Sequence, residues 1–209
     1  MSTEKKLRFE TLQLHYHNYR GKRYRHDQVH NLFGYYMTRS ASEAFERYVP
    51  EKRILLFSRA SYIGMHRFGG IWQGDNASWW SHLKMNVKMM PSLNMCGFLY
   101  TGADVGGFGA DATEDLVLRW LEFAVFTPLL RNHSARGTRR QEVYRFSHVE
   151  KFADVIGVRY QILPYIYSEY MKAALRNTMM FNPLSFLYGE DALARQVEDQ
   201  LFIGENVMV

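Results

Sequence analysis

The chain has 209 residues, a formal net charge of +5 and 47% hydrophobic residues. A chain of this length and apolar content can bury one sizeable core, which excludes an intrinsically disordered protein. The single cysteine, Cys96, excludes a disulfide framework within the chain. The N-terminal residues hold no apolar signal segment, and no apolar run reaches the length of a membrane span. We therefore expect a cytoplasmic protein, with neither secretion nor membrane insertion.

The positive charge makes nucleic acid a partner to consider. The densest cluster interleaves basic residues with tyrosines, and it consists of Tyr16, Tyr19, Arg20, Lys22, Arg23, Tyr24 and Arg25. Such stretches can follow a phosphate backbone and stack on bases. The cluster is short, however, and no nucleic-acid module follows it, so a solvated loop is the favoured interpretation. We expect no nucleic-acid partner.

The N-terminal part of the chain is predicted to be helical and irregular. An amphipathic helix is expected over residues 3–14, followed by an irregular stretch through the basic cluster. The pattern turns helical over residues 29–48, contains a Ser40-x-x-Glu43 sequence typical of a capping box, and stops at Pro50.

The middle of the chain alternates strands with helices. The expected elements are strands at 53–57 and 70–73, a helix at 78–90 closed by Pro91, a strand at 94–101, a helix at 111–126, a strand at 127–131, and a helix at 148–176 with a kink or break at Pro164. This alternation requires parallel strands joined by helical crossovers, which is an α/β fold. Four such units are half of an eight-stranded barrel.

The C-terminal residues are predicted to form strands at 183–188, 200–203 and 207–209. The last of these strands stops at the end of the chain, so we expect the natural domain to continue. The expected organisation is a lead-in over residues 1–27, a partial (β/α)8 barrel over 28–178, and a truncated C-terminal β domain over 179–209.

Polar side chains stand where the predicted strands end. They are Arg59, Asp75, Asp104 and the pair Arg131 and His133. The C-terminal ends of barrel strands face one mouth, so these side chains are expected to converge. Carboxylates, a guanidinium and an imidazole beside aromatic rings suit a polyhydroxylated substrate, because they fix hydroxyl groups by charge-assisted hydrogen bonds. The aromatic neighbours are Trp72 and Phe108.

Each of these polar residues also has a purely structural interpretation. Asp75 lies in a Gly-Asp-Asn corner, which is an ordinary turn or helix cap. Arg59 can pair with a structural carboxylate, Asp104 can form a turn, and His133 can be a loop histidine. Singly, the structural interpretation is favoured for each residue, but polar groups at successive strand ends together favour a site.

Several other chemistries are not supported. No His-Glu-x-x-His helix motif occurs, and His15-x-His17 lies outside the set of strand ends, so we expect no metal. The glycines of the 102–109 loop have the wrong spacing for a dinucleotide fingerprint, and no Walker loop is present. A serine hydrolase is also disfavoured, since no Gly-x-Ser-x-Gly elbow is found.

Several motifs in family-like order carry a resemblance. They are Arg59…Gly64-x-x-Arg67-Phe68, Trp72-x-Gly74-Asp75-Asn76, Gly102-x-Asp104-x-Gly106-Gly107-Phe108, Leu118-Arg119-Trp120, Arg131-Asn132-His133, and Arg159-Tyr160-x-x-x-Pro164-Tyr165-x-Tyr167. Over roughly residues 28–209, the chain resembles glycoside hydrolase family 31, and the bacterial α-glucosidases of that family most closely.

The resemblance implies a (β/α)8 barrel, retaining hydrolysis of terminal α-linked glucose from oligosaccharides, and no metal or organic cofactor. By the same resemblance, Asp75 matches the general acid/base. The residues that match the sugar pocket are Arg59 and His133 for the hydroxyls, Asp104 as a further carboxylate, and Trp72 and Phe108 as aromatic walls.

The chain departs from the family pattern in one important respect. The nucleophile of the family lies in an Asp-Met-Asn-Glu-like motif, and no such motif occurs in these 209 residues. Smaller departures are Phe68, where the family often has Tyr, and Val143, where a Pro is common. We therefore expect the second half of the barrel, about strands 5–8 with their helices, plus the first strands of a C-terminal β domain.

Such a half barrel is expected to be inactive alone, and to self-associate unless a complementing N-terminal half covers its exposed sheet edges. The alternative is a non-catalytic carbohydrate-binding or decayed half barrel. An in-frame Asp-Met-Asn-Glu-like motif upstream of Met1 in the DNA would favour the enzyme fragment.

Overall fold

The computed structural model describes residues 14–209, so the helix expected over residues 3–14 lies outside the described residues except at its last position. The chain divides into two compact units, Met1–Gly69 and Gly70–Val209, which we call the N-terminal and the C-terminal unit. The boundary falls inside the segment 28–178 that the sequence assigns to the barrel.

The N-terminal unit begins with a β-hairpin. Strands β1 (Tyr16–Tyr19) and β2 (Lys22–Arg25) pair antiparallel, and the turn residues Arg20 and Gly21 both have positive φ, 50° and 75°. Positive φ at both central residues gives the turn whose twist matches that of the paired strands. The expectation of an irregular stretch here was wrong, because the turn at Arg20 and Gly21 lets the two flanking segments pair as strands. The Arg23 guanidinium lies 3.9 Å from the Tyr16 ring centroid.

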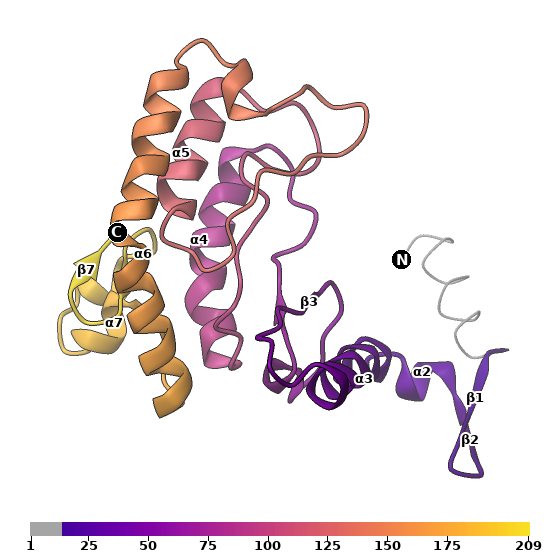
Figure 1. Cartoon of the computed structure of the whole chain (residues 1–209). Coiled ribbons are helices and arrows are strands. Elements are labelled where there is room, and N and C mark those ends of the chain that lie inside the picture. The colour runs from indigo at the N-terminus through magenta and orange to yellow at the C-terminus, as the bar shows by residue number, and fades with distance from the viewer. Residues whose placement is uncertain (1–13) are drawn as a thin grey trace. The chain divides into compact units, whose positions relative to one another are not determined.

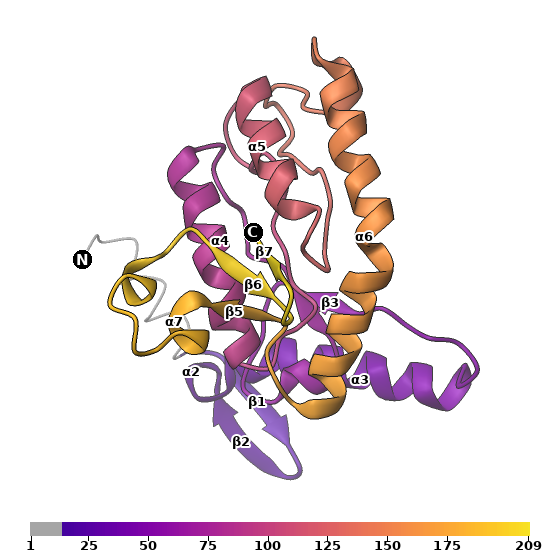
Figure 2. The same ribbon diagram turned by 90° about the vertical axis from the view of Figure 1, so that its left-hand side faces the viewer.

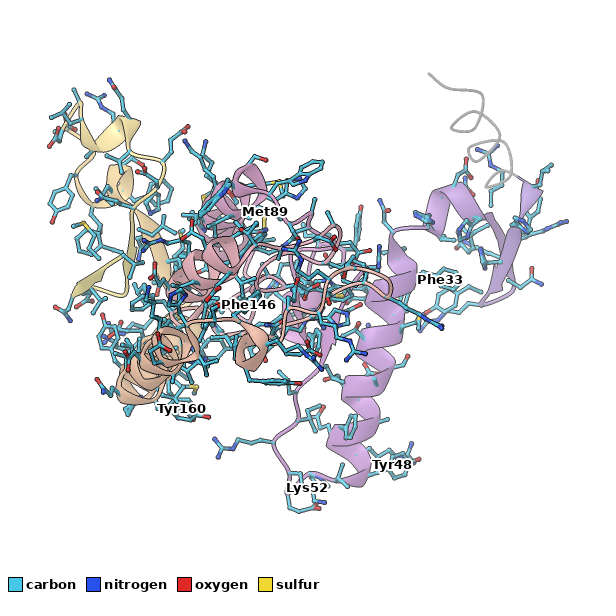
Figure 3. All side chains as sticks on the ribbon, turned by 90° about the horizontal axis from the view of Figure 1, so that it is seen from above. Phe33, Tyr48, Lys52, Met89, Phe146 and Tyr160 are labelled. Carbon is cyan, nitrogen blue, oxygen red and sulfur yellow. The ribbon has the colours of Figure 1, made fainter. Side chains whose placement is uncertain are left out.

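Two helices follow the hairpin, α2 (His26–Val29) and α3 (Leu32–Tyr48). Together they confirm most of the helix expected over residues 29–48. The expected capping box is wrong, since Ser40 and Glu43 lie inside α3 and Glu43 pairs with Arg39 at 2.6 Å instead. Phe33 and Tyr48 lie towards the two ends of this helix (Figure 3).

The N-terminal unit ends with the short strand β3 (Phe57–Ser58) and the 3-10 turn η1 (Met65–Arg67). The strand expected over residues 53–57 was therefore largely wrong, because only Phe57 is assigned to a strand. The apolar run is not buried on both faces, since Leu55 is 58% exposed.

Three helices frame the C-terminal unit, namely α4 (Trp80–Met95), α5 (Glu114–Ala124) and α6 (Val149–Arg176), and α5 packs against the other two (Figure 1). The start of α5 is fixed by its N-cap, because the Thr113 hydroxyl accepts a hydrogen bond from the Leu116 N–H at 3.3 Å. Helix α6 is continuous through Pro164, so of the expected kink or break, the break was wrong and the kink stays a prediction. No helix among residues 14–209 is long and apolar enough to cross a membrane.

The end of α4 corrects another expectation, because the helix continues past Pro91 to Met95. Proline lacks an N–H and normally disfavours a helix interior. Here the next turn is held from outside by Asn94, which is 3% exposed. Its Oδ1 accepts hydrogen bonds from the Met180 and Phe181 N–H groups at 3.0 and 2.9 Å, so tertiary contacts outweigh the proline.

Extended segments run between these helices, although only β4 (Gly70–Ile71) is assigned as a strand. Backbone hydrogen bonds connect successive segments in the order expected from the sequence, and the isolated bridge between Asp104 and Arg131 is parallel. No residue of the expected strand at 94–101 is assigned to a strand, and residues 94 and 95 belong to α4. The connecting bonds are Ile71 N to Tyr100 O (3.2 Å), Gln73 N to Gly102 O (2.9 Å), Leu129 N to Thr101 O (3.2 Å) and Val105 N to Arg131 O (2.9 Å).

The C-terminal unit contains two apolar cores. The first joins α5 and α6 to the segment around Val105, and its fully buried large side chains include Trp120 and Phe152. The second packs Met90 of α4 and Ile166 of α6 against the C-terminal strands.

The C-terminal strands β5 (Phe181–Pro183), β6 (Leu201–Ile203) and β7 (Val207–Met208) form an antiparallel sheet in that order (Figure 2). The helix α7 (Leu184–Leu187) and the 3-10 turn η3 (Ala194–Gln196) lie between β5 and β6. The strand expected over residues 183–188 was wrong. Pro183 is the last residue that pairs with β6, and a helical turn then satisfies backbone groups that have no strand partner.

Candidate functional site

The corner that carries Asp75 follows β4 and is held by its neighbour Asn76. Gly74 has a φ of 87°, which a residue with a side chain rarely adopts, and Asp75 itself is exposed. The Asn76 carbonyl accepts hydrogen bonds from the Phe108 and Gly109 N–H groups at 2.7 and 2.8 Å. The corner and the loop that bears Phe108 are thus joined directly.

The Asn76 side chain anchors the same corner to α4. It is 2% exposed and its amide lies 2.8 Å from the side-chain amide of Asn86, which is fully buried. Two buried amides that bond each other satisfy groups that would otherwise be costly to bury. Asn76 therefore supports the structure of the corner. Its hydrogen bonds assign no structural role to the Asp75 side chain.

Asp104 and Arg131 form the centre of the candidate site. The Asp104 side chain is completely buried, and its Oδ1 accepts a hydrogen bond from Arg131 Nε at 2.5 Å. The guanidinium of Arg131 also lies 5.3 Å from the ring centroid of Trp72. The other carboxylate oxygen, Oδ2, is buried and has no hydrogen-bond partner among the described residues.

The surroundings of Asp104 shift its titration. Burial raises the pKa of the Asp104 carboxyl, Arg131 and then His133 oppose that shift, and the negative charge of Asp75 adds to it. A carboxyl group without water is harder to ionise, and an opposite charge within a few ångströms favours the ionised form. These interactions place Asp75, Arg131 and His133 within electrostatic range of Asp104.

An aromatic pair borders the same region. The rings of Phe108 and His133 have centroids 5.2 Å apart and are tilted by 33°. The Phe108 carbonyl accepts a hydrogen bond from the Ala135 N–H at 2.8 Å, which ties the 102–109 loop to the segment after His133.

The structure thus brings together Trp72, Asp75, Asp104, Phe108 and His133 within the C-terminal unit. Arg59 belongs to the N-terminal unit, next to a local turn in which the Ser58 hydroxyl donates to the Ala60 carbonyl at 2.9 Å. Its place in the site stays a prediction.

Sequence reasoning missed two residues that support the site, Arg131 as the direct partner of Asp104 and Gln141. Arg131 was placed at the correct strand end but was not assigned to a carboxylate. Gln141 is 1% exposed and donates to carbonyls 34 and 36 residues away, at Gly107 and Val105. No local pattern reveals such distant partners.

Histidines gather in the N-terminal unit. His26 Nδ1 lies 2.7 Å from His17 Nε2, and His26 Nε2 lies 3.1 Å from His30 Nδ1. His26 and His30 are four residues apart, a metal-type spacing that the sequence-based expectation left out. His26 offers opposite ring nitrogens to its two neighbours, so the three rings do not converge on one ion. Residues 14–209 contain no group of three or more ligating side chains arranged to hold a metal.

A cavity of about 570 Å³ lies in the C-terminal unit beside α6. Its lining residues are Tyr100, Val105, Leu121, Pro128, Leu130, Asn132, Glu142, Val143, Tyr144, Ile156, Arg159, Tyr160 and Leu163. The Arg159 guanidinium there donates to the Val125 and Thr127 carbonyls at 2.6 and 2.8 Å, which caps the end of α5. The lining is mostly apolar, and it includes none of the residues Trp72, Asp104 and Arg131.

Comparison with known proteins gives a consistent result. Residues 2–169 match the model of the glycosyl hydrolases family 31 TIM-barrel domain. The chain is 35% identical over 188 residues to alpha-glucosidase 2 of Bacillus thermoamyloliquefaciens, covering 88% of this chain and 24% of that protein. The chain thus spans about a quarter of the length of that relative.

Solved structures agree with this match. The family 31 alpha-glucosidase from Bacteroides thetaiotaomicron superimposes with a TM-score of 0.81 at 31% identity, covering 95% of this chain and 34% of that one. A glucosidase II alpha subunit, solved with alpha3-Glc2 bound, gives a TM-score of 0.80 at 32% identity over 87% of this chain and 20% of its own. The match extends over most of the sequence, and the chain belongs to glycoside hydrolase family 31, within its TIM-barrel domain.

Proposed function

We propose that the chain contributes the acid/base and the sugar-contacting residues of a retaining α-glucosidase site, which removes terminal α-linked glucose from oligosaccharides. The related proteins include enzymes named as alpha-glucosidases, and the match covers the segment that carries the candidate site. The proposal assigns Asp75 as the general acid/base and Asp104, His133, Trp72 and Phe108 as sugar contacts.

The observation that carries the proposal is the state of Asp104. One oxygen of this fully buried carboxylate is bonded to Arg131, and the other has no hydrogen-bond partner among residues 14–209. An acceptor of this kind is costly to bury unless a ligand or water satisfies it. A sugar hydroxyl would donate to Oδ2 while Arg131 holds the carboxylate in place.

The aromatic residues extend this site in a way that suits a sugar. The Trp72 ring lies 5.3 Å from the Arg131 guanidinium, and the Phe108 and His133 rings have centroids 5.2 Å apart. The C–H face of a hexose packs on aromatic rings, while its hydroxyls need fixed polar partners. Arg59 remains the proposed second cationic contact, carried over from the family resemblance.

Asp75 is proposed to donate a proton to the departing glycosidic oxygen. It is exposed at the end of β4 and lies near enough to Asp104 to influence the titration of that group. A retaining glycosidase needs a second carboxyl about 5–5.5 Å from the acid, acting as nucleophile. We propose that this nucleophile lies outside the 209 residues, because no Asp-Met-Asn-Glu-like motif occurs in them.

We further propose that these residues form the second half of a barrel whose remainder is supplied by another polypeptide segment. Apolar side chains beside the α6 cavity support this, since Tyr144 is 66% and Tyr160 is 73% exposed (Figure 3 shows Tyr160 on α6). Large exposed apolar side chains at a cavity edge are typical of a surface that another element covers. Without that cover, we expect the chain to self-associate.

The first test measures ligand binding by the purified chain. Calorimetry with 1-deoxynojirimycin, a glucose-shaped cation, should show binding, and Asp104→Asn should weaken it about 10- to 100-fold because a charge-assisted hydrogen bond is lost. The matched control is Asp115→Asn, a carboxylate on α5 whose side chain is 68% exposed. Equal affinity in the two variants would remove Asp104 from the site.

The second test concerns catalysis. The chain alone should release no aryl alcohol from an aryl α-glucoside, and Asp75→Asn should leave the affinity for the iminosugar largely unchanged. If the chain does turn over the substrate and Asp75→Asn abolishes turnover, the inactive-alone proposal is wrong while the acid/base assignment stands.

A non-catalytic carbohydrate-binding protein is the second candidate function. It is favoured by the absence of the nucleophile motif from these residues, together with the intact Asp104 centre. Adding a polypeptide that contains the first barrel half of a family 31 α-glucosidase separates the two candidates. Restored turnover supports the enzyme, whereas binding without turnover under any addition supports the binding protein.

A further inference from the structure

We propose that Gln141 is a positioning residue of the candidate site, which clamps the loop carrying Asp104 and Phe108 to the segment carrying His133. The inference rests on the proposed function, because positioning has a meaning only if the site holds a sugar. Gln141 does not itself touch the substrate in this proposal.

The contacts of the Gln141 side chain carry the inference. Its Nε2 donates its two hydrogens to the Val105 and Gly107 carbonyls at 3.0 Å each, and the His133 carbonyl lies 3.5 Å from the same nitrogen. Val105 follows Asp104 directly, and Gly107 precedes Phe108. One amide group, 1% exposed, therefore holds the backbone beside three of the proposed sugar contacts.

The orientation of this amide is fixed by its partners. Backbone carbonyls only accept hydrogen bonds, so the nitrogen of Gln141 must face Val105, Gly107 and His133. The amide oxygen, Oε1, is buried and has no hydrogen-bond partner among the described residues. A residue of the same shape without the NH₂ group cannot make these bonds in any rotamer.

The backbone of Gln141 is anchored on the same segment as well. Its carbonyl accepts a hydrogen bond from Asn132 Nδ2 at 2.7 Å, and Asn132 stands between Arg131 and His133. The clamp therefore closes a ring that passes through Asp104, its ion pair with Arg131, and back to Gln141.

The loop is built to lie against this amide. Gly106 has a φ of 85°, and a Cβ there would meet Val117 Cγ2 at 2.8 Å and Gln141 Nε2 at 3.3 Å. The absence of a side chain lets the backbone approach the glutamine closely. Displacement of the loop by even about 1 Å would misplace its sugar contacts, which typically costs up to about 100-fold in function.

A comparable residue in the same unit provides the control. Asn94 is 3% exposed and also makes three hydrogen bonds, two through Oδ1 to the Met180 and Phe181 N–H groups and one from Nδ2 to the Phe98 carbonyl at 3.0 Å. None of its partners adjoins a proposed sugar contact. Removing either amide should destabilise the unit, but only Gln141 should affect the site.

The experiment compares Gln141→Met and Asn94→Leu in the 209-residue chain, at a temperature where both variants are folded by circular dichroism. Amide hydrogen exchange is read at Val105 and Ala135, which bond across the clamped segments, and at Met180 and Phe181, which bond to Asn94. Calorimetry measures the affinity of each variant for 1-deoxynojirimycin.

For Gln141→Met we expect faster exchange at Val105 and Ala135, and an affinity lower by about 10- to 100-fold. For Asn94→Leu we expect faster exchange at Met180 and Phe181, with an affinity within about twofold of the wild type. Gln141→Glu keeps the shape but replaces the NH₂ group, so it should behave as Gln141→Met does at neutral pH.

Two results overturn the proposal. One is an unchanged exchange rate at Val105 and Ala135 in Gln141→Met, and the other is an equal loss of affinity in Asn94→Leu, which would show a general structural role. If the wild-type chain binds no iminosugar, the proposed function fails, and the exchange measurement alone then decides whether the clamp exists.

Discussion

The two units of the chain differ in how much apolar surface they bury. Among residues 14–69, only Gly34, Thr38 and Met65 are buried. The C-terminal unit has two apolar cores, with fully buried side chains such as Trp120 and Phe152. Since hydrophobic burial is the main stabilising contribution to folding, most of the stability of the chain must come from the C-terminal unit.

This difference matters for the candidate site. The Asp104 centre is built on the cored unit, where ion pair, loop and clamp are all internal. Arg59 belongs to the unit with few buried side chains. Sites on rigid elements hold their geometry better than sites on poorly packed ones, so the part of the site around Asp104 is the part expected to be preorganised.

The largest test of this comparison truncates one large aromatic side chain in each unit. Trp120→Ala should lower the free energy of unfolding by about 3–5 kcal/mol, because the side chain is completely buried and leaves a cavity. Tyr48→Ala at the end of α3 should change it by less than about 0.5 kcal/mol, because that ring is 71% exposed. Urea denaturation of both variants checks this, and similar losses would contradict the contrast between the units.

A pair of glycine substitutions sharpens the comparison inside the C-terminal unit. Gly204 has a φ of 61°, and a Cβ there would overlap the carboxylate of Glu169. Gly204→Ala should therefore cost about 1–3 kcal/mol through strain and repacking. Gly157 lies inside α6, and an added Cβ would meet no atom within 4 Å apart from the backbone of its own helix, so Gly157→Ala should stabilise by about 0.5–1 kcal/mol.

Thermal denaturation of the two alanine variants measures the difference directly. Opposite shifts in Tm are expected. If Gly204→Ala melts as the wild type does, the β6–β7 turn adapts easily and the second core is looser than its burial indicates.

The third prediction concerns pH. Burial raises the pKa of Asp104 above its ordinary value of 3.8, so the native state binds a proton more tightly than the unfolded state does. The stabilising contribution of this proton is fully present below the unfolded pKa and is lost as the pH rises through the native pKa.

The free energy of unfolding of the wild type, relative to that of Asp104→Asn, should therefore fall as the pH rises above the ordinary pKa of the carboxyl. Urea titrations at a series of pH values test this. A difference that grows as the pH rises would mean that Arg131 lowers the pKa of the carboxyl more than burial raises it.

The smallest effect is expected at the surface of the N-terminal unit. Arg39→Met removes the ion pair with Glu43 on α3, in which both side chains are about half exposed. Exposed pairs of this kind contribute little because water and salt screen them. We expect no measurable change in the urea midpoint, and a clear loss would show that α3 is held by charges where apolar packing is sparse.

The long periodic helices were predictable from the sequence, whereas short elements were not. The helix expected over residues 148–176 agrees with α6 to within one residue at both ends. The helical periodicity of apolar residues extends over all 28 residues of α6, which makes it easy to recognise. The hairpin at β1 and β2 was missed because its register depends on the positive φ of Arg20 and Gly21. Helix α7 was missed because pairing with β6 stops at Pro183.

The candidate site also contains residues whose roles were predictable from the sequence and residues whose roles were not. The convergence of Asp104 with Asp75 and His133 follows from strand ends that face one edge, which sequence alone indicates. The role of Gln141 depends on carbonyl groups more than 30 residues away, which no local pattern encodes. The position of Arg59 within the site has no test in the structure.

The parallel bridge between Asp104 and Arg131 gives the site an additional property. These residues are neighbours through backbone pairing and also through their side chains, with Val105 N bonded to Arg131 O at 2.9 Å and the ion pair beside it. A slip of one residue between the two segments would turn the Arg131 side chain to the opposite face of the sheet. Sugar binding at Oδ2 would thus report the correct register of the sheet, so that an iminosugar titration doubles as an assay of native folding.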